Sequence, residues 1–170
     1  MLRIVLMLVS AVWAGEIERL IDQNRLGEAL RSCQRYQTLR ASDNARLMEC
    51  AEVYFRTNRI AEGDKVMDKL RANYASNDYQ LLKALASIKK KEYGSAQEIL
   101  DKLASTYRGS TVGNKAQQLK AELYEAKGNL DASAFIYKQV AADFPSNPKA
   151  QWGLARYYLS RGDVVRAKKH

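Results

Sequence analysis

The stretch WGLARYYLSRGDVVRA, residues 152–167, holds the pattern on which the fold depends. Leu154 and Tyr158 are four residues apart, the spacing of one face of a helix. Gly162 then allows the chain to reverse, and Asp163 is well placed to cap a following helix. We therefore interpret the Arg-Gly-Asp tripeptide at this point as an interhelical turn, in preference to a cell-adhesion motif.

The same turn pattern occurs five times along the chain. A polar or Gly pair precedes an apolar residue, and a small residue follows three positions later. The apolar landmarks are Leu26, Ile60, Tyr93, Leu130 and Val164. They are separated by 34, 33, 37 and 34 residues, a regular period that indicates a repeat protein. We expect the step of 37 to be absorbed by a longer loop over residues 109–114.

Apolar residues recur three and four apart on both sides of each turn, so each repeat is predicted to be a pair of helices. A single pair cannot bury its apolar stripes, and neighbouring pairs must therefore stack. The sequence predicts an all-α fold, an α-solenoid of stacked antiparallel helix pairs over residues 15–170. The expected units are 15–43, 44–76, 77–110, 111–147 and an incomplete 148–170.

The last two units resemble the tetratricopeptide repeat family. The fifth unit has the expected residues Leu154, Ala155, Tyr158, Gly162 and Ala167. The fourth has Ala121, Tyr124, Gly128, Tyr137 and Pro145 in matching places. The first three units depart from the pattern, because Gly is replaced by Asn24, Asn58 and Lys91. The resemblance implies about 4.5 repeats in a right-handed superhelix, and it says little about chemistry.

In this family the first helix of each pair lines a concave groove that holds a peptide or a helix of a partner. Carried over by repeat register, the resemblance implies a groove formed by Met48, Glu52, Phe55, Leu81, Leu85, Ile88, Gln118, Glu122, Trp152 and Arg156. Phe55 and Trp152 are the expected anchors, whereas the three aliphatic residues of the third unit could equally belong to the core. Met48 and Glu52 stand where the carboxylate clamp of chaperone-binding members would need Lys and Asn.

The N-terminus has the layout of a secretory signal peptide. A short positive start, Met1-Leu2-Arg3, precedes an apolar run to Ala14, and small or short residues stand before a possible cleavage after Ala14. The run is too short to span a bilayer as a helix. We expect residues 1–14 to be removed and the product to be exported, most simply to a bacterial periplasm. The alternative is a buried first helix of a cytosolic protein.

Cys33 and Cys50 are the two cysteines of the chain. They fall on adjacent predicted helices that should pack together. In an exported protein they could form a disulfide, and otherwise they are two small buried apolar residues.

The residues that catalysis needs are scarce. The single histidine, His170, is the last residue, so no base is available for a Ser or Cys nucleophile, and neither H-E-x-x-H nor C-x-x-C is present. The stretch from Gly109 to Lys115 has some likeness to a phosphate loop, but it is too short between its glycines and follows no strand. We predict a protein that is not an enzyme and that has no cofactor and no metal site.

The net charge of +9 is dispersed over the helices, so we expect no nucleic acid partner. The preferred function is a scaffold that binds a protein segment in its groove. Short motifs at residues 73–77 and 143–148 resemble exported members of the family, the Tol–Pal-associated division coordinator and the helical lipoprotein of the barrel-assembly machinery, which are adaptors in envelope assembly. The alternative is an accessory subunit that binds an anionic envelope polymer or lipid through its basic outer surface.

The fifth unit is incomplete, because its second helix has only about seven residues, Val164–His170. A solenoid normally ends in a polar cap. We therefore expect either further repeats or a partner that covers this end.

Overall fold

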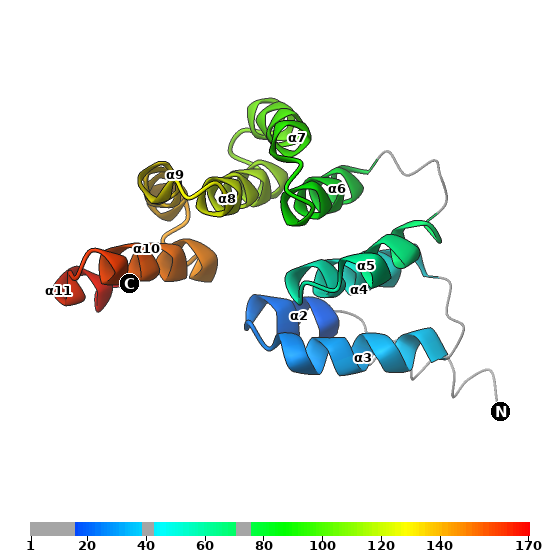
Figure 1. Cartoon of the computed structure of the whole chain (residues 1–170). Helices are drawn as coiled ribbons and strands as arrows, with labels where there is room; N and C mark the ends of the chain where they lie inside the picture. The colour runs from blue at the N-terminus through cyan, green and yellow to red at the C-terminus, as the bar shows by residue number, and fades with distance from the viewer. Residues whose placement is uncertain (1–15, 39–42, 71–75) are drawn as a thin grey trace. The chain divides into compact units, whose positions relative to one another are not determined.

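The computed structural model describes residues 16–38, 43–70 and 76–170. The expected signal peptide and its cleavage site lie outside these ranges. All regular secondary structure in the described part of the chain is helical, as the sequence predicts, and within each of two compact units successive helices pack as antiparallel hairpins (Figure 1). No helix in the described ranges is both long enough and apolar enough to cross a membrane.

The chain forms two compact units, Met1–Tyr74 and Ala75–His170. The described helices of unit 1 are α2 (Glu16–Asp22), α3 (Leu26–Thr38), α4 (Asn44–Arg56) and α5 (Ile60–Met67). Those of unit 2 are α6 (Asn77–Lys89), α7 (Tyr93–Thr106), α8 (Thr111–Ala126), α9 (Leu130–Asp143), α10 (Pro148–Ser160) and α11 (Val164–Ala167).

The five interhelical turns share one backbone conformation. A residue with positive φ stands at the same place in each, with φ between 55° and 76°. The five residues are Asn24, Asn58, Lys91, Gly128 and Gly162. In every turn the N–H of this residue donates to the carbonyl three positions back, and the next N–H donates to the carbonyl five positions back, over 2.8–3.1 Å. This pair of bonds is the Schellman motif, which satisfies the last carbonyls of the first helix.

The repeat identified in the sequence is therefore a repeat of backbone geometry. Asn tolerates the left-handed conformation better than most residues, whereas Lys91 adopts it at a cost of about 1 kcal/mol. Beyond the last turn, Asp163 caps α11, because its carboxylate accepts the N–H of Arg166 over 2.9 Å. The tripeptide at this point is an interhelical turn, as predicted.

Close approach at glycines shapes the packing between helices. A Cβ on Gly153 of α10 would lie 2.3 Å from the Tyr137 ring of α9, so the ring packs directly on the backbone of the next hairpin. Tyr137 and Leu154 belong to the buried cluster that joins α9, α10 and α11. Gly63 has a similar role within unit 1, where it lies against the ring of Phe55.

The expected long loop over residues 109–114 is wrong. Ser110 caps α8 by accepting the N–H of Gly113, and the helix begins at Thr111. The additional residues lengthen α8, which has 16 residues where α4, α6 and α10 have 13. A Cβ on Gly113 would lie 2.1 Å from the carbonyl oxygen of Tyr107. Gly113 is thus needed for packing between α7 and α8, which accounts for one of the glycines behind the likeness of this stretch to a phosphate loop.

The structure pairs Cys33 of α3 with Cys50 of α4 in a disulfide. Their Cα atoms are 5.3 Å apart, within the range that a disulfide spans. Both side chains are fully buried, so the bond crosses the interior between the first and second hairpins. In the chain-entropy model a loop of this length contributes about 3 kcal/mol to the free energy of unfolding.

The turn geometry predicts opposite effects for two glycines. A Cβ added to Gly128 or to Gly94 would meet no atom within 4 Å, but only Gly128 has a positive φ. Gly128→Ala should lower the free energy of unfolding by about 1 kcal/mol, whereas Gly94→Ala in α7 should raise it by up to about 1 kcal/mol. Lys91→Gly should also raise it, by about 1 kcal/mol. Urea unfolding followed by circular dichroism measures all three, and equal effects for the two alanine variants would contradict this account.

Candidate protein-binding face of helix α10

Helix α10 begins with a strong local signal. Asn147 accepts the N–H of Ala150 over 3.0 Å, and Pro148 occupies the first turn, where a missing N–H costs nothing. Its buried residues are Ala150, Gly153, Leu154 and Tyr158. The helical period places a different set on the other side. We call this set the α10 face, and it consists of Lys149, Trp152, Arg156 and Leu159.

Two apolar side chains stand out on the α10 face. Trp152 is 61% exposed and Leu159 is 56% exposed, which is high for residues of this size. They are seven residues apart, two helical turns, so their attachment points lie about 10 Å apart on one side of the helix. They are therefore the two large apolar side chains that α10 offers to solvent on this side.

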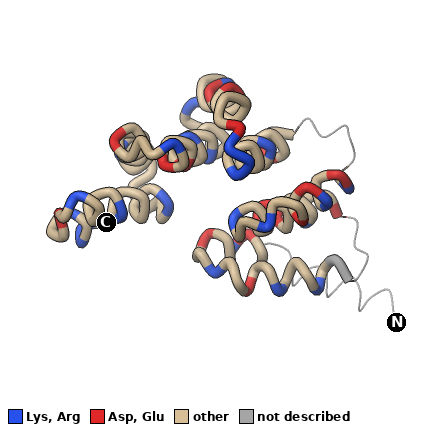
Figure 2. Tube along the Cα trace, viewed as in Figure 1, with Lys and Arg blue, Asp and Glu red and all other residues tan. Residues whose placement is uncertain are grey.

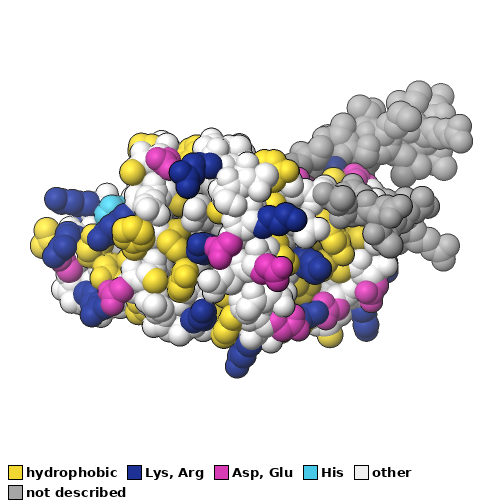
Figure 3. Space-filling view, turned by 90° about the horizontal axis from the view of Figure 1, so that it is seen from above, with side chains coloured by type: hydrophobic (Ala, Val, Ile, Leu, Met, Phe, Trp, Pro, Cys, Tyr) yellow, Lys and Arg dark blue, Asp and Glu magenta, His cyan; other side chains and the backbone are white. Residues whose placement is uncertain are grey.

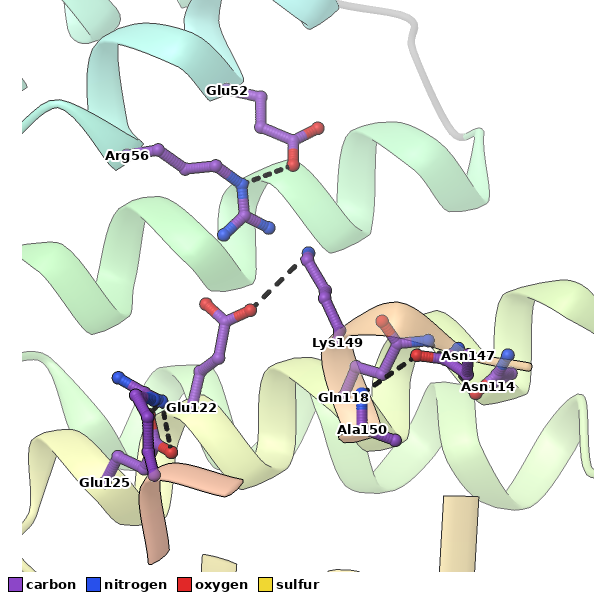
Figure 4. A network of polar contacts seen from close by, with 10 residues as sticks. Glu52, Arg56, Asn114, Gln118, Glu122, Glu125, Asn147, Lys149 and Ala150 are labelled. Atoms are coloured by element: carbon purple, nitrogen blue, oxygen red, sulfur yellow. Dashed lines mark hydrogen bonds and ion pairs between the residues drawn. The ribbon is translucent and has the colours of Figure 1, made fainter. Parts of the chain in front are cut away.

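Two ion pairs connect the α10 face to α8, and Figure 4 shows the one between Lys149 and Glu122. Arg156 Nη2 lies 2.6 Å from both carboxylate oxygens of Glu125. Lys149 Nζ lies 3.5 Å from Glu122 Oε1. Partial burial alone would lower the pKa of Arg156, but the hydrogen bond and the charge of Glu125 outweigh it and raise the pKa. Pairs of this kind add little stability at a surface, and their effect here is to hold the side chains on either side of Trp152 in place.

The two predicted groove residues of α8 lie beside this face. Glu122 is half-buried and takes part in the ion pair with Lys149. Gln118 is buried and donates through its amide to the side chain of Asn114 over 3.1 Å. Of the four groove residues predicted on α8 and α10, Trp152 and Arg156 are the exposed ones.

The structure assigns a packing role to Phe55, in place of the anchoring role that the sequence suggested. Its side chain is fully buried, and its ring lies against Gly63 of α5. The close approach to glycine leaves no room for a partner on that side of the ring.

The three aliphatic residues predicted for the groove of the third unit are also buried. Leu81, Leu85 and Ile88 are 6%, 2% and 5% exposed, in a helix that packs on α7 and α8. Their burial favours the second of the two interpretations that the sequence left open, that these residues belong to the core. Met48 and Glu52, in unit 1, are half-buried, and Glu52 accepts a hydrogen bond from Arg56 over 2.7 Å.

Glu49 is a half-buried acid that no sequence pattern indicates. It lies on α4, and its Oε2 is buried without a hydrogen-bond partner among the described residues. Burial raises its pKa to about 7, assisted by the charges of Glu18, Asp43 and Glu52 and opposed by that of Arg46. The periodic spacing of apolar residues predicts which face of a helix is buried. It does not predict that the carboxyl group of an acidic residue beside that face is shielded from water.

The raised pKa of Glu49 predicts a pH dependence of stability. In the unfolded chain this carboxyl ionises near pH 4.5, whereas in the folded chain it stays protonated to about pH 7. The folded state therefore loses stability as the pH rises through that interval, by at most about 3 kcal/mol. Glu49→Gln should remove this loss, so the variant should be more stable than the parent at pH 8 and similar to it at pH 4.

Urea unfolding at both pH values measures this difference. Glu98→Gln, which changes an exposed acid on α7, is the control and should alter stability little at either pH. A Glu49 variant no more stable than the parent at pH 8 would show that the carboxylate is solvated in the folded chain.

Charge is distributed over the helices without a single dominant patch (Figure 2). Lys and Arg alternate with Asp and Glu, and many form local ion pairs, such as Arg59 with Glu62 and Lys120 with Asp101. Within residues 16–38, 43–70 and 76–170, no three acidic, His or Cys side chains are arranged to hold a metal ion.

Within each unit the hairpins stack in chain order, and this arrangement defines the class of tandem helical-repeat proteins. No protein family model matches the chain, and no curated protein does. Among solved structures, the chain is similar to the crystal structure of a tetratricopeptide repeat protein from Parabacteroides merdae, with a TM-score of 0.57 and 21% sequence identity. The match covers 94% of this chain and 61% of the other. At this identity the likeness shows the fold alone, and the predicted tetratricopeptide-repeat-like solenoid is confirmed.

Proposed function

We propose that this chain is a non-catalytic scaffold that binds a protein segment on the α10 face, with Trp152 as the principal anchor. The observation that carries the proposal is the exposure of Trp152 on a face whose charged residues are fixed by ion pairs to α8. Tryptophan and arginine are among the residues most enriched at positions that dominate binding energy.

The charges of the site favour a partner with an apolar centre. Lys149 and Arg156 are matched by Glu122 and Glu125, so the four side chains carry no net charge. An apolar residue of the partner can cover Trp152 without leaving a charge unpaired. Leu159 offers a second apolar contact two turns further along α10.

The alternative function, binding of an anionic polymer or lipid through the basic outer surface, depends on a different force. Attraction by dispersed surface charge is screened by salt, whereas contact with Trp152 is not. Many of the cations are already paired with acidic residues of the chain, which reduces the field that a polymer would meet.

The test uses a chain that begins at Gly15, in which Trp152 is the only tryptophan because Trp13 is absent. Peptides are selected from a displayed library against the purified chain, and their affinity is measured by tryptophan fluorescence. We expect a blue shift of the emission on binding and an affinity that changes little between about 50 and 500 mM salt, where the electrostatic alternative predicts a steep loss.

A pair of variants tests whether binding depends on the α10 face or on any exposed aromatic side chain. Trp152→Ala should weaken binding at least about tenfold, measured by calorimetry because the variant has no tryptophan. Phe135→Ala is the matched control, since Phe135 is 62% exposed on α9 but lies outside the α10 face. Binding that survives Trp152→Ala and collapses in salt would favour the polymer-binding alternative.

We also propose that the scaffold is exported and acts in the bacterial cell envelope, most simply in the periplasm. The support is the layout of residues 1–14 as a signal peptide, together with a disulfide, which persists in oxidising compartments. The weak likeness to envelope adaptors is in agreement with this.

This proposal predicts the state of the mature chain. Expressed in a bacterial host, the protein should be recovered from the periplasmic fraction with Gly15 as its first residue and with no free thiol. Mass spectrometry with and without a thiol-alkylating reagent measures both properties. Recovery of the chain in the cytoplasm with Met1 intact and both cysteines alkylated would contradict export.

A further inference from the structure

Unit 2 contains a cleft between the C-terminal ends of α7 and α9 and the first two turns of α8. Both α7 and α9 pack on α8 (Figure 1). The cleft has a volume of about 440 Å³, within the range of sites that hold small molecules. The buried part of its lining consists of Ala104, Gly113 and Val140, one residue from each helix.

The length of α8 contributes to this cleft. The helix has 16 residues where α4, α6 and α10 have 13, and its first two turns supply Gly113, Asn114 and Gln117 to the lining. Gly113 has no room for a side chain, since a Cβ there would lie 2.1 Å from the carbonyl oxygen of Tyr107. Main-chain atoms therefore line the cleft at this point.

Four polar side chains of the cleft have no internal partner. Those of Arg108, Gln117, Gln139 and Asp143 form no hydrogen bond or ion pair with any other described residue. The side chain of Asn114 accepts one hydrogen bond through its oxygen, which leaves its two N–H donors for other contacts. A ligand can therefore bind these groups without breaking a contact inside the protein.

The two charges of the cleft have opposite signs and stand on opposite walls. Arg108 follows the end of α7, and Asp143 is the last residue of α9. Basic and acidic side chains are likewise interspersed over the face of the molecule shown in Figure 3. A polyanion in the cleft would be repelled by Asp143, and a polycation by Arg108. A ligand that carries one charge of each sign matches both walls.

We propose that the cleft binds a small zwitterion with peptide groups between its charged ends, a dipeptide or tripeptide. The carboxylate of the ligand pairs with Arg108 and its ammonium group pairs with Asp143. Gln117 and Gln139 bind the peptide groups between them, because a primary amide offers both a donor and an acceptor, as a peptide group does. This inference does not depend on the α10 face.

Other ligands fit the cleft less well. A helix of a partner protein is about 10–12 Å across with its side chains, too wide for a cleft of this volume. A neutral sugar could bind the amide groups, but it would remove water from Arg108 and Asp143 without supplying a charge to either.

The test uses trialanine and two blocked forms of it, one acetylated at its N-terminus and one amidated at its C-terminus. Binding to the full chain is measured by NMR from the side-chain amide signals of Gln117 and Gln139, which detects weak complexes. Trialanine should shift these signals. Each blocked form should bind about tenfold more weakly, because it has lost one charge-assisted contact.

Two variants connect each end of the ligand to its wall. Arg108→Gln and Asp143→Asn should each weaken trialanine about tenfold. Amidation should then cost nothing more in Arg108→Gln, and acetylation should cost nothing more in Asp143→Asn. Lys102→Gln, an exposed change on α7 outside the cleft, and Trp152→Ala on the α10 face are the controls and should leave the affinity within about twofold. Circular dichroism checks that every variant stays folded.

Three results would overturn the proposal. The first is that trialanine at millimolar concentration leaves the signals of Gln117 and Gln139 unchanged. The second is that the blocked forms bind as tightly as trialanine, or that blocking costs as much in the variants as in the parent, which would show that the two charges do not contact the ends of the ligand. The third is loss of trialanine binding in Trp152→Ala, which would place the peptide on the α10 face.

Discussion

The structure depends on one backbone constraint, a residue in the left-handed conformation at the end of the first helix of every hairpin. Two main-chain hydrogen bonds close each of the five turns. They fix the direction in which the second helix leaves, and so they decide that the apolar sides of both helices meet. Hairpins of this shape can then pack on one another, as α9 and α10 do where the ring of Tyr137 lies against Gly153.

The sequence predicts the turns well because the constraint is local. Gly128 and Gly162 indicate a left-handed residue directly, and the spacing of the apolar landmarks identified the same position at Lys91, where the residue type alone would not. Helix period was equally informative. The start of α8 was missed because Ser110 caps a helix that includes Gly113, and glycine so near a predicted loop usually indicates irregular structure.

The candidate site was harder to predict, because register alone does not determine burial. Phe55 and Trp152 occupy comparable faces of their helices, yet Phe55 is buried on Gly63 and Trp152 is exposed. That difference depends on residues of other helices. Glu49 was missed for the same reason, since the loss of solvent around its carboxyl depends on how α4 is covered. The pattern of apolar residues thus predicts the helices. Which of the predicted groove residues is exposed on α10 depends on how the helices pack.

The hydrogen bonds that close each turn come from the main chain, and side chains take no part in them. Any residue that tolerates the left-handed conformation can therefore stand there, as Asn, Lys and Gly do in this single molecule. An architecture specified in this way imposes few invariant side chains. Hairpins copied from a common ancestor could exchange most of their residues and keep their shape, so kinship among such proteins persists in three dimensions long after it has faded from their sequences.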